Sequence, residues 1–183
     1  LKRVGISYLF SLPLFIASFF LFFITIKDFS VKKTNLSQKI SHFGFSLFIL
    51  SVLVNGVLAK EYSSNMKVGD ERKFLNKTIK FESLEVNESK NYQSLEANFK
   101  ISDKNNSIYL KPEVRVYDQP QTITSEADIK STLYSDNFLV FNILKNDGFY
   151  NVRYQIKPFM IWIWISVILI SFGGVLSIVK KND

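Results

Sequence analysis

The 183-residue chain contains no cysteine and a single histidine, His42. The absence of cysteine excludes disulfide bonds, zinc–thiolate sites and thiol catalysis within this sequence. With one histidine and no cysteine, the residues for a nucleophile–base–acid set are lacking. Glycine-rich phosphate-binding loops are also absent. We therefore expect no catalytic residue in this chain, and any redox or metal chemistry has to pass through His42.

The net charge of +7 does not indicate nucleic-acid binding, because the basic residues are unevenly distributed. Between residues 60 and 157 there are 15 Lys or Arg and 14 Asp or Glu, so this region is nearly neutral. Its acidic residues are interspersed with lysines, as on a solvated surface; they include Glu82, Glu85, Glu88, Glu96, Asp118, Glu126 and Asp128. The other basic residues flank hydrophobic segments: Lys2, Arg3, Lys27, Lys32, Lys33, Lys39, Lys180 and Lys181.

Three hydrophobic segments are long enough to cross a bilayer as helices; they span residues 8–26, 40–58 and 158–179. The loop 27–39 holds four lysines and the chain ends in KKND, so the positive-inside rule places both in the cytoplasm. Tyr154, Trp162 and Trp164 would then form an aromatic belt at the outer end of the third span. We expect two transmembrane helices and a cytoplasmic loop in residues 1–58, an extracytoplasmic domain in 59–157, and the last transmembrane helix with a cytoplasmic tail in 158–183.

The region between the second and third spans is predicted to be rich in β-strands. Apolar and polar residues alternate in five runs, at residues 77–86, 92–101, 107–117, 137–144 and 150–156. Turn-forming clusters separate these runs near Gly69, at 102–107 and at 145–148. Residues 124–134 are instead predicted to be helical, with Thr124 or Ser125 as N-cap. A small barrel or sandwich of five to seven strands is expected.

His42 lies just inside the second hydrophobic segment, where an imidazole is costly unless it is paired, lines a polar cavity or binds a metal. Its spacing to Phe45, Ser46 and Ile49 places all four on one helix face, and Gly44 would leave space beside it. A flat macrocycle or a partner helix could approach such a face. The alternative is a structural histidine that bonds a neighbouring helix or reaches the cytoplasmic interface. For the Gly-Gly pair at 173 and 174 a close helix–helix contact is the preferred interpretation.

Five sequence features occur in an order that resembles the C-terminal part of the CcmF family of haem lyase subunits, which act in cytochrome c maturation. They are His42-Phe43-Gly44, Gly69-Asp70, Asn91-Tyr92 before the strand at 96–101, the stretch LKPEVRVYDQPQTITSEADI at 110–129, and YQIKPFMIWIW from Tyr154 with a later Gly-Gly. The resemblance covers residues 40–179 and about the last third of a full-length family member.

This resemblance implies that His42 is one of two axial ligands of a transmembrane b-type haem. The opposing histidine, the tryptophan-rich haem-handling segment and the two outer-face histidines of the family are absent from this chain. The family joins haem vinyl groups to the thiols of a Cys-x-x-Cys-His segment of apocytochrome c and receives haem from a membrane-anchored chaperone. Apocytochrome c, other maturation subunits including that chaperone, and membrane lipid are therefore the expected partners, and nucleic acid is not.

The expected location is the bacterial inner membrane, as a multi-pass protein with residues 59–157 in the periplasm; the mitochondrial inner membrane is the alternative. The chain begins with Leu1, so we expect a fragment or a processed product, or a separately encoded C-terminal subunit. It is then part of a haem lyase without the full active site. Two other functions remain open: a non-enzymatic docking subunit of a maturation complex, and a lyase paralogue for a specialised cytochrome such as nitrite reductase.

Overall fold

The computed structural model describes residues 4–31, 34–103, 106–144 and 148–181, with side chains between residues 12 and 179. The chain divides into two compact units, which are described separately here. The helical unit comprises Leu1–Ala59, Thr132–Ser135 and Lys157–Asp183. The β unit comprises Lys60–Ser131 and Asp136–Ile156.

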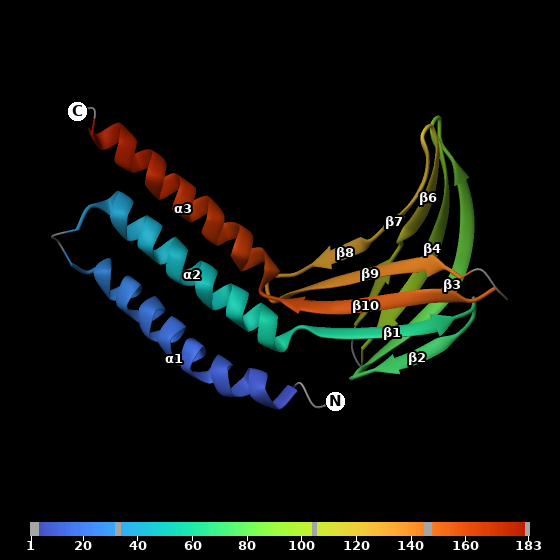
Figure 1. The fold of residues 1–183 in the computed structure, drawn as a ribbon, viewed down its shortest axis with the longest axis horizontal. Coiled ribbons are helices and arrows are strands. Elements are labelled where there is room, and N and C mark those ends of the chain that lie inside the picture. The colour runs from blue at the N-terminus through green and yellow to red at the C-terminus, as the bar shows by residue number, and fades with distance from the viewer. Residues whose placement is uncertain (1–3, 32–33, 104–105, 145–147, 182–183) are drawn as a thin grey trace. The chain divides into compact units, whose positions relative to one another are not determined.

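The helical unit contains α1 (Val4–Asp28), α2 (Leu36–Leu58) and α3 (Met160–Lys181), and α2 lies between the other two (Figure 1). Each helix coincides with one of the hydrophobic segments of the sequence. Within the ranges that the structure describes, Leu36–Leu58 and Met160–Val179 are long and apolar enough to cross a membrane. The side chains of the first turns of α1 lie outside the described residues.

Small residues allow α2 to approach both neighbouring helices closely. A Cβ atom added to Gly44 would lie 3.0 Å from the backbone nitrogen of Ile170, so α3 passes directly over this glycine. A Cβ added to Gly173 would lie 2.8 Å from the carbonyl oxygen of Ser37 on α2. On the α1 side, the hydroxyls of Thr25 and Ser46 are 2.8 Å apart. Close approach through small and hydroxyl-bearing residues is typical of helices that pack in a membrane.

The β unit is a sandwich of two sheets. One sheet has the order β1-β10-β9-β8, and the other has the order β2-β3-β4-β6-β7 with β5 also paired to β4. The described strands are β1 (Lys60–Met66), β2 (Glu71–Phe74), β3 (Lys77–Glu88), β4 (Tyr92–Ser102), β5 (Ser107–Leu110), β6 (Glu113–Asp118), β7 (Gln121–Glu126), β8 (Asp128–Ser131), β9 (Ser135–Ile143) and β10 (Tyr150–Pro158). Neighbouring strands such as β3 and β4 pair in antiparallel register.

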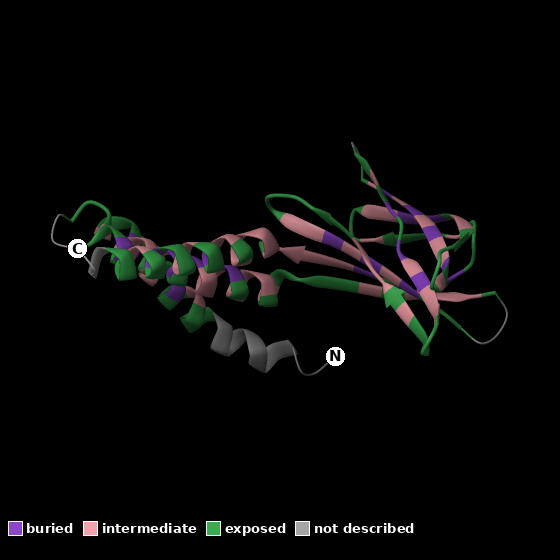
Figure 2. Ribbon diagram, turned by 90° about the horizontal axis from the view of Figure 1, so that it is seen from above, coloured by how far each residue is buried: buried purple, intermediate pink, exposed green. Residues whose placement is uncertain are grey.

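The core of the sandwich lies between the two sheets, and both sheets carry buried residues (Figure 2). Ile79 and Phe81 of β3 and Phe99 of β4 are fully buried, and the rings of Phe81 and Phe99 stack with centroids 4.4 Å apart. From the other sheet, Leu139 of β9 and Val152 of β10 are equally buried. The period-two alternation predicted for these strands is therefore the pattern of burial.

Two sequence-based expectations about the β unit are wrong. Residues 124–134, predicted to be helical, instead contain the end of β7, β8 and a turn. Antiparallel pairing decides this segment, because Ser125 pairs with Val114 of β6 and Ile129 pairs with Phe138 of β9. The described residues also contain ten strands, not five to seven. The turns predicted at 102–107 and 145–148 fall partly outside the described residues.

Candidate functional site

His42 lies near the N-terminal end of α2, on a part of the helix surface that stays uncovered. Its side chain is exposed, and Phe45, one turn further along, is 54% exposed. The adjacent faces of α2 are occupied, since Gly44 packs against α3 and Ser46 bonds to α1. The imidazole is therefore accessible from outside this three-helix unit.

The predicted common face of His42, Phe45, Ser46 and Ile49 is only partly present. A step of four residues turns a helix by about 40° beyond a full rotation, and this brings Ser46 to Thr25 of α1, where it is fully buried. Ile49 lines an apolar recess of about 320 Å³ between α1 and α2. Gly44 is covered by α3, so it does not leave space beside the imidazole. The open face thus consists of His42 and Phe45.

A second recess, of about 380 Å³, borders His42 and is lined by residues from the N-terminal end of α2 and the later turns of α3. Six of its eight lining residues carry polar side chains; the eight are Asn35, Ser37, Gln38, Ser41, His42, Gly173, Gly174 and Ser177. A Cβ added to Gly174 would meet no atom within 4 Å, whereas Gly173 beside it is in tight contact with α2. The predicted glycine contact is therefore confirmed for Gly173 and wrong for Gly174, which keeps the recess open.

No hydrogen bond joins the imidazole of His42 to any of the residues that the structure describes. The same ranges contain no group of three or more His, Cys, Asp or Glu that could hold a metal ion. A free metal ion would thus find one protein ligand here. A metal held within a larger group, with further ligands of its own, matches a single accessible imidazole much better.

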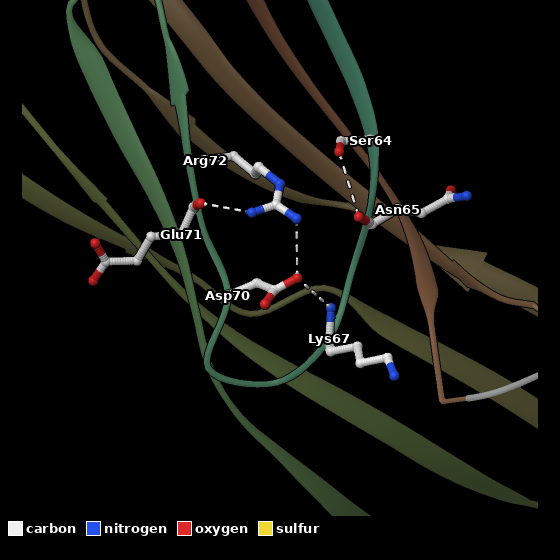
Figure 3. A network of polar contacts seen from close by, with 6 residues as sticks. All are labelled: Ser64, Asn65, Lys67, Asp70, Glu71 and Arg72. Carbon is white, nitrogen blue, oxygen red and sulfur yellow. Dashed lines mark hydrogen bonds and ion pairs between the residues drawn. The ribbon is translucent and has the colours of Figure 1, made fainter.

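The Gly69-Asp70 pair has a structural explanation in the β unit, shown in Figure 3. Gly69 adopts a φ of +93°, a conformation that side chains disfavour, and it turns the chain between β1 and β2. The Asp70 carboxylate accepts a hydrogen bond from the Lys67 backbone N–H at 3.1 Å, and it forms an ion pair with the Arg72 guanidinium at 3.3 Å. This motif therefore stabilises a turn.

A polar network crosses the interior of the sandwich between its two sheets. The Lys77 ammonium of β3 donates to Asn137 Oδ1 at 2.9 Å and to the Tyr154 hydroxyl at 3.2 Å. Tyr154 in turn donates to Asn137 Oδ1 at 2.5 Å. Burial lowers the pKa of Lys77, although the Asp103 carboxylate opposes this shift. Burial also raises the pKa of Tyr154, and the negative charge of Asp103 adds to that effect.

The sequence position of Tyr154 predicted that it belongs to an aromatic belt at the membrane surface. This prediction is wrong, because the residue lies in the core of the sandwich. Its side chain has no exposed surface because β10 continues the alternation of the core through this residue. Trp162 and Trp164 do lie on the first turns of α3, and Trp164 is 63% exposed.

The profile of a protein family described as "CcmF C-terminal beta-sandwich" matches residues 57–158, which is the whole β unit with its junctions to α2 and α3. The chain belongs to the CcmF family. The predicted resemblance to the C-terminal part of CcmF is thereby confirmed.

Relatives of this CcmF-family chain are cytochrome c biogenesis proteins. It is 32% identical to the cytochrome c-type biogenesis protein ccl1 of Rhodobacter capsulatus, over 63% of this chain and 18% of that protein. It is 28% identical to the probable cytochrome c-type biogenesis protein NrfE of Escherichia coli K12, over 81% of this chain and 27% of that protein. The chain thus spans about a quarter of the length of these relatives or less.

The fold is also found in a solved structure titled "Cytochrome c Heme Lyase CcmF", with a TM-score of 0.63 and 13% sequence identity. The similarity covers 96% of this chain and 34% of that one. The helices and the sandwich together therefore follow a fold already seen in this family.

Sequence reasoning identified His42 but missed the surroundings that make it accessible. Gly174 and Ser177 lie on α3 and reach the recess only because α3 packs along α2. Sequence reasoning also missed the turn at Thr132–Ser135, which belongs to the helical unit although its neighbours in sequence belong to the β unit. Its adjacent apolar residues, Leu133 and Tyr134, were the available signal.

Proposed function

We propose that this chain is the C-terminal membrane portion of a cytochrome c haem lyase, in which His42 provides one axial ligand of a b-type haem. The observation that carries the proposal is an imidazole, free of partners among the described residues, at the open face of an apolar helix in a CcmF-family chain. The chain spans a small part of its relatives, so the second axial ligand and the residues that handle the incoming haem belong to other segments or subunits.

The proposed membrane placement has the helices crossing the bacterial inner membrane and residues 59–157 in the periplasm. It is supported by the lysines of the loop 27–39 and of the C-terminal end, which would face the cytoplasm. The helical unit also exposes large apolar side chains, which suits contact with lipid or with further helices; they include Leu12, Ile16, Phe20, Phe23, Ile168, Phe172 and Ile178.

The residues around His42 are compatible with a haem. The exposed Phe45 offers an apolar contact for a flat macrocycle, and the recess lined by Gly174 leaves room beside the imidazole. Iron binds the neutral imidazole, and a hydrogen bond to the other ring nitrogen fixes its tautomer. Gln38 and Ser41, which line the same recess, carry suitable polar groups. When bound, the haem would supply electron transfer toward the haem being attached to apocytochrome c.

The remaining parts of the chain have supporting roles in this proposal. The sandwich would offer a docking surface to maturation subunits, including the haem chaperone, and to apocytochrome c. Its ion pairs lie at its surface: Lys111, just after β5, pairs with Glu96 of β4, and Arg115 pairs with Glu113 two residues earlier in the same strand, β6. We assign no bond-making step to these residues, because the covalent attachment takes place at groups outside this chain.

A second candidate is a lyase paralogue that serves a specialised cytochrome, and the similarity to NrfE supports it. Supplying the chain with its partner subunits to cells that lack their own lyase distinguishes the two candidates. Attachment of haem to a general cytochrome c supports the first candidate. Attachment to a specialised cytochrome alone, such as nitrite reductase, supports the second.

The test of the haem ligand is the His42→Ala variant in the assembled lyase complex. We expect the complex to assemble and to lose the b-type absorbance of the buried haem. In the His42→Gly variant, added imidazole should restore part of that absorbance, because it can occupy the place of the missing side chain. Val52→Ala, which trims another exposed residue of α2, serves as the matched control and should leave the spectrum unchanged. An unchanged spectrum in His42→Ala contradicts the ligand assignment.

A further inference from the structure

The β8–β9 turn carries two apolar side chains that the fold leaves uncovered. Leu133 is 58% exposed and Tyr134 is 75% exposed, although they are adjacent and large. A pair of large apolar side chains held at an exposed tip is unusual at a purely aqueous surface. The turn belongs to the helical unit, unlike the strands that it connects.

The turn itself is tightly bonded. The Thr132 hydroxyl donates to the Ser135 carbonyl at 2.7 Å and accepts from the Ser135 N–H at 3.1 Å. The Thr132 N–H also donates to the Ser135 carbonyl, at 3.0 Å. These bonds close the loop without using the side chains of Leu133 or Tyr134. Both side chains are thus presented by a fixed backbone.

The same two residues attach the turn to the start of α3 through their carbonyl groups. The Trp162 indole N–H donates to the Leu133 carbonyl at 2.8 Å, and the Phe159 N–H donates to the Tyr134 carbonyl at 2.9 Å. Phe159 has a φ of +61°, a conformation rarely adopted by residues other than glycine, which brings its N–H to the turn. Figure 1 shows the β8–β9 connection beside the first turn of α3.

The chain just before α3, where the β8–β9 turn is attached, is also hydrogen-bonded to α2. Asn55, near the end of α2, donates from its side-chain amide to the Pro158 carbonyl at 2.7 Å. The ends of α2 and β10, the start of α3 and the turn therefore meet at one level of the helical unit. The turn thus lies beside the first residues of α3, with the Leu133 carbonyl bonded to the Trp162 indole and the Tyr134 carbonyl bonded to the Phe159 N–H.

We propose that Leu133 and Tyr134 form an interfacial wedge that inserts into the outer leaflet of the membrane beside α3. Lipid is the favoured occupant because the large exposed side chains at this junction, Leu133, Tyr134 and Phe159 among them, are apolar or amphipathic aromatic groups, which concentrate at the bilayer interface. Trp164, 63% exposed on the first turns of α3, continues this surface toward the hydrocarbon region. The inference rests on the proposed membrane placement of α3.

Depth-dependent fluorescence quenching tests the wedge in the full chain. The chain has no cysteine, so Leu133→Cys and Tyr134→Cys each give one labelling site for an environment-sensitive fluorophore. The backbone bonds to α3 do not involve the replaced side chains, so the turn should remain in place. In phosphatidylcholine–phosphatidylglycerol vesicles, lipids brominated near the headgroups should quench these labels more strongly than lipids brominated near the chain ends.

The control is Val86→Cys, which labels an equally exposed apolar residue, 72% exposed, on β3 of the β unit. Its label should not be quenched, and quenching equal to that of the turn overturns the proposal. Trp162 and Trp164 are the only tryptophans of the chain and report on α3 directly. If their emission is quenched while the turn labels are not, the wedge fails and the membrane placement stands. If neither is quenched, the membrane placement fails and the wedge with it.

Discussion

Asn137 and Tyr154 bring polar atoms into the interior of the sandwich, where Lys77 meets both of them. Asn137 is 5% exposed and Tyr154 is fully buried, so water cannot replace a lost partner. An unpaired polar group costs more in such surroundings than at the surface. Because Lys77 lies on β3 and the other two residues on β9 and β10, the network fixes the two sheets relative to each other.

Tyr154→Phe should lower the free energy of unfolding of the β unit by about 1–2 kcal/mol, because it leaves Asn137 and Lys77 with one partner fewer. Denaturant unfolding followed by circular dichroism in detergent measures this loss. Tyr109→Phe is the matched control, since Tyr109 is 57% exposed and its hydroxyl is not buried. Equal stability of the two variants would show that the network makes no net contribution.

The Tyr154 hydroxyl should ionise only at a pH above the ordinary tyrosine pKa of 10.0, because burial raises its pKa. Above pH 10 the unfolded chain releases this proton while the folded chain retains it, so this residue makes folding less favourable as the pH rises. The lowered pKa of Lys77 acts in the opposite direction just below its ordinary value of 10.5. Tyrosinate absorbance across an alkaline titration measures the ionisation, and Tyr154→Phe should remove this step. A titration unchanged by that substitution contradicts the assignment.

At the scale of elements, α2 and α3 associate through positions where one of the two helices carries no side chain. Gly44 faces the backbone of α3, and Gly173 faces the backbone of α2. The buried Ser166 of α3 satisfies its hydroxyl by bonding to the Ile163 carbonyl in its own helix, at 2.6 Å. The contact is therefore held by close packing, which tolerates little added volume.

Two adjacent glycines allow a sharp test of this packing. Gly173→Ala should destabilise the helical unit by about 1–3 kcal/mol, since the new methyl group meets backbone atoms that cannot move aside. Gly174→Ala should be neutral or slightly stabilising, because its Cβ meets no atom within 4 Å and alanine favours a helix. Unfolding in mixed detergent micelles compares the two variants. Equal effects would mean that the contact at Gly173 does not limit helix association.

The elements differ in how far their sequence determines them. The long hydrophobic segments predict α1, α2 and α3, and alternation predicts β3, β4, β9 and β10 because each has one buried face. Strand β8 could not be predicted, since its residues are mostly exposed and only pairing with β9 makes it a strand. His42 was predictable as a polar residue in an apolar segment, but its recess was not, because α3 supplies Gly174 and Ser177 through tertiary packing.

For the whole molecule, the division into two units determines which residues stabilise the sandwich. The buried core of the sandwich consists of side chains from the β unit alone, and partly buried neighbours such as Tyr62 and Ile156 belong to it as well. Folding of the sandwich thus does not draw its apolar contacts from the helices. Among the described side chains of the helical unit, Leu47 is the one large apolar residue that is buried, and many others are exposed.

Residues 60–156 expressed alone should therefore fold in water without detergent. We expect a β-type circular dichroism spectrum and a cooperative thermal transition. The same segment with Phe99→Ala is the comparison, because removing a fully buried phenyl ring costs about 3–5 kcal/mol and should abolish or broadly weaken the transition. An aggregated or unfolded wild-type segment would show that the sandwich depends on the helices.

The pairing of β1 with β10 sets how the sandwich is joined to the rest of the chain. Lys60, just after α2, is directly paired with Ile156, just before α3. The path into the sandwich and the path out of it are consequently neighbouring strands, so the helices are linked across a gap that a hairpin could bridge. Insertions and exchanges of whole domains succeed at such paired ends. Because of this arrangement, the sandwich could be shortened, enlarged or replaced by another domain while α2 and α3 keep their mutual contact.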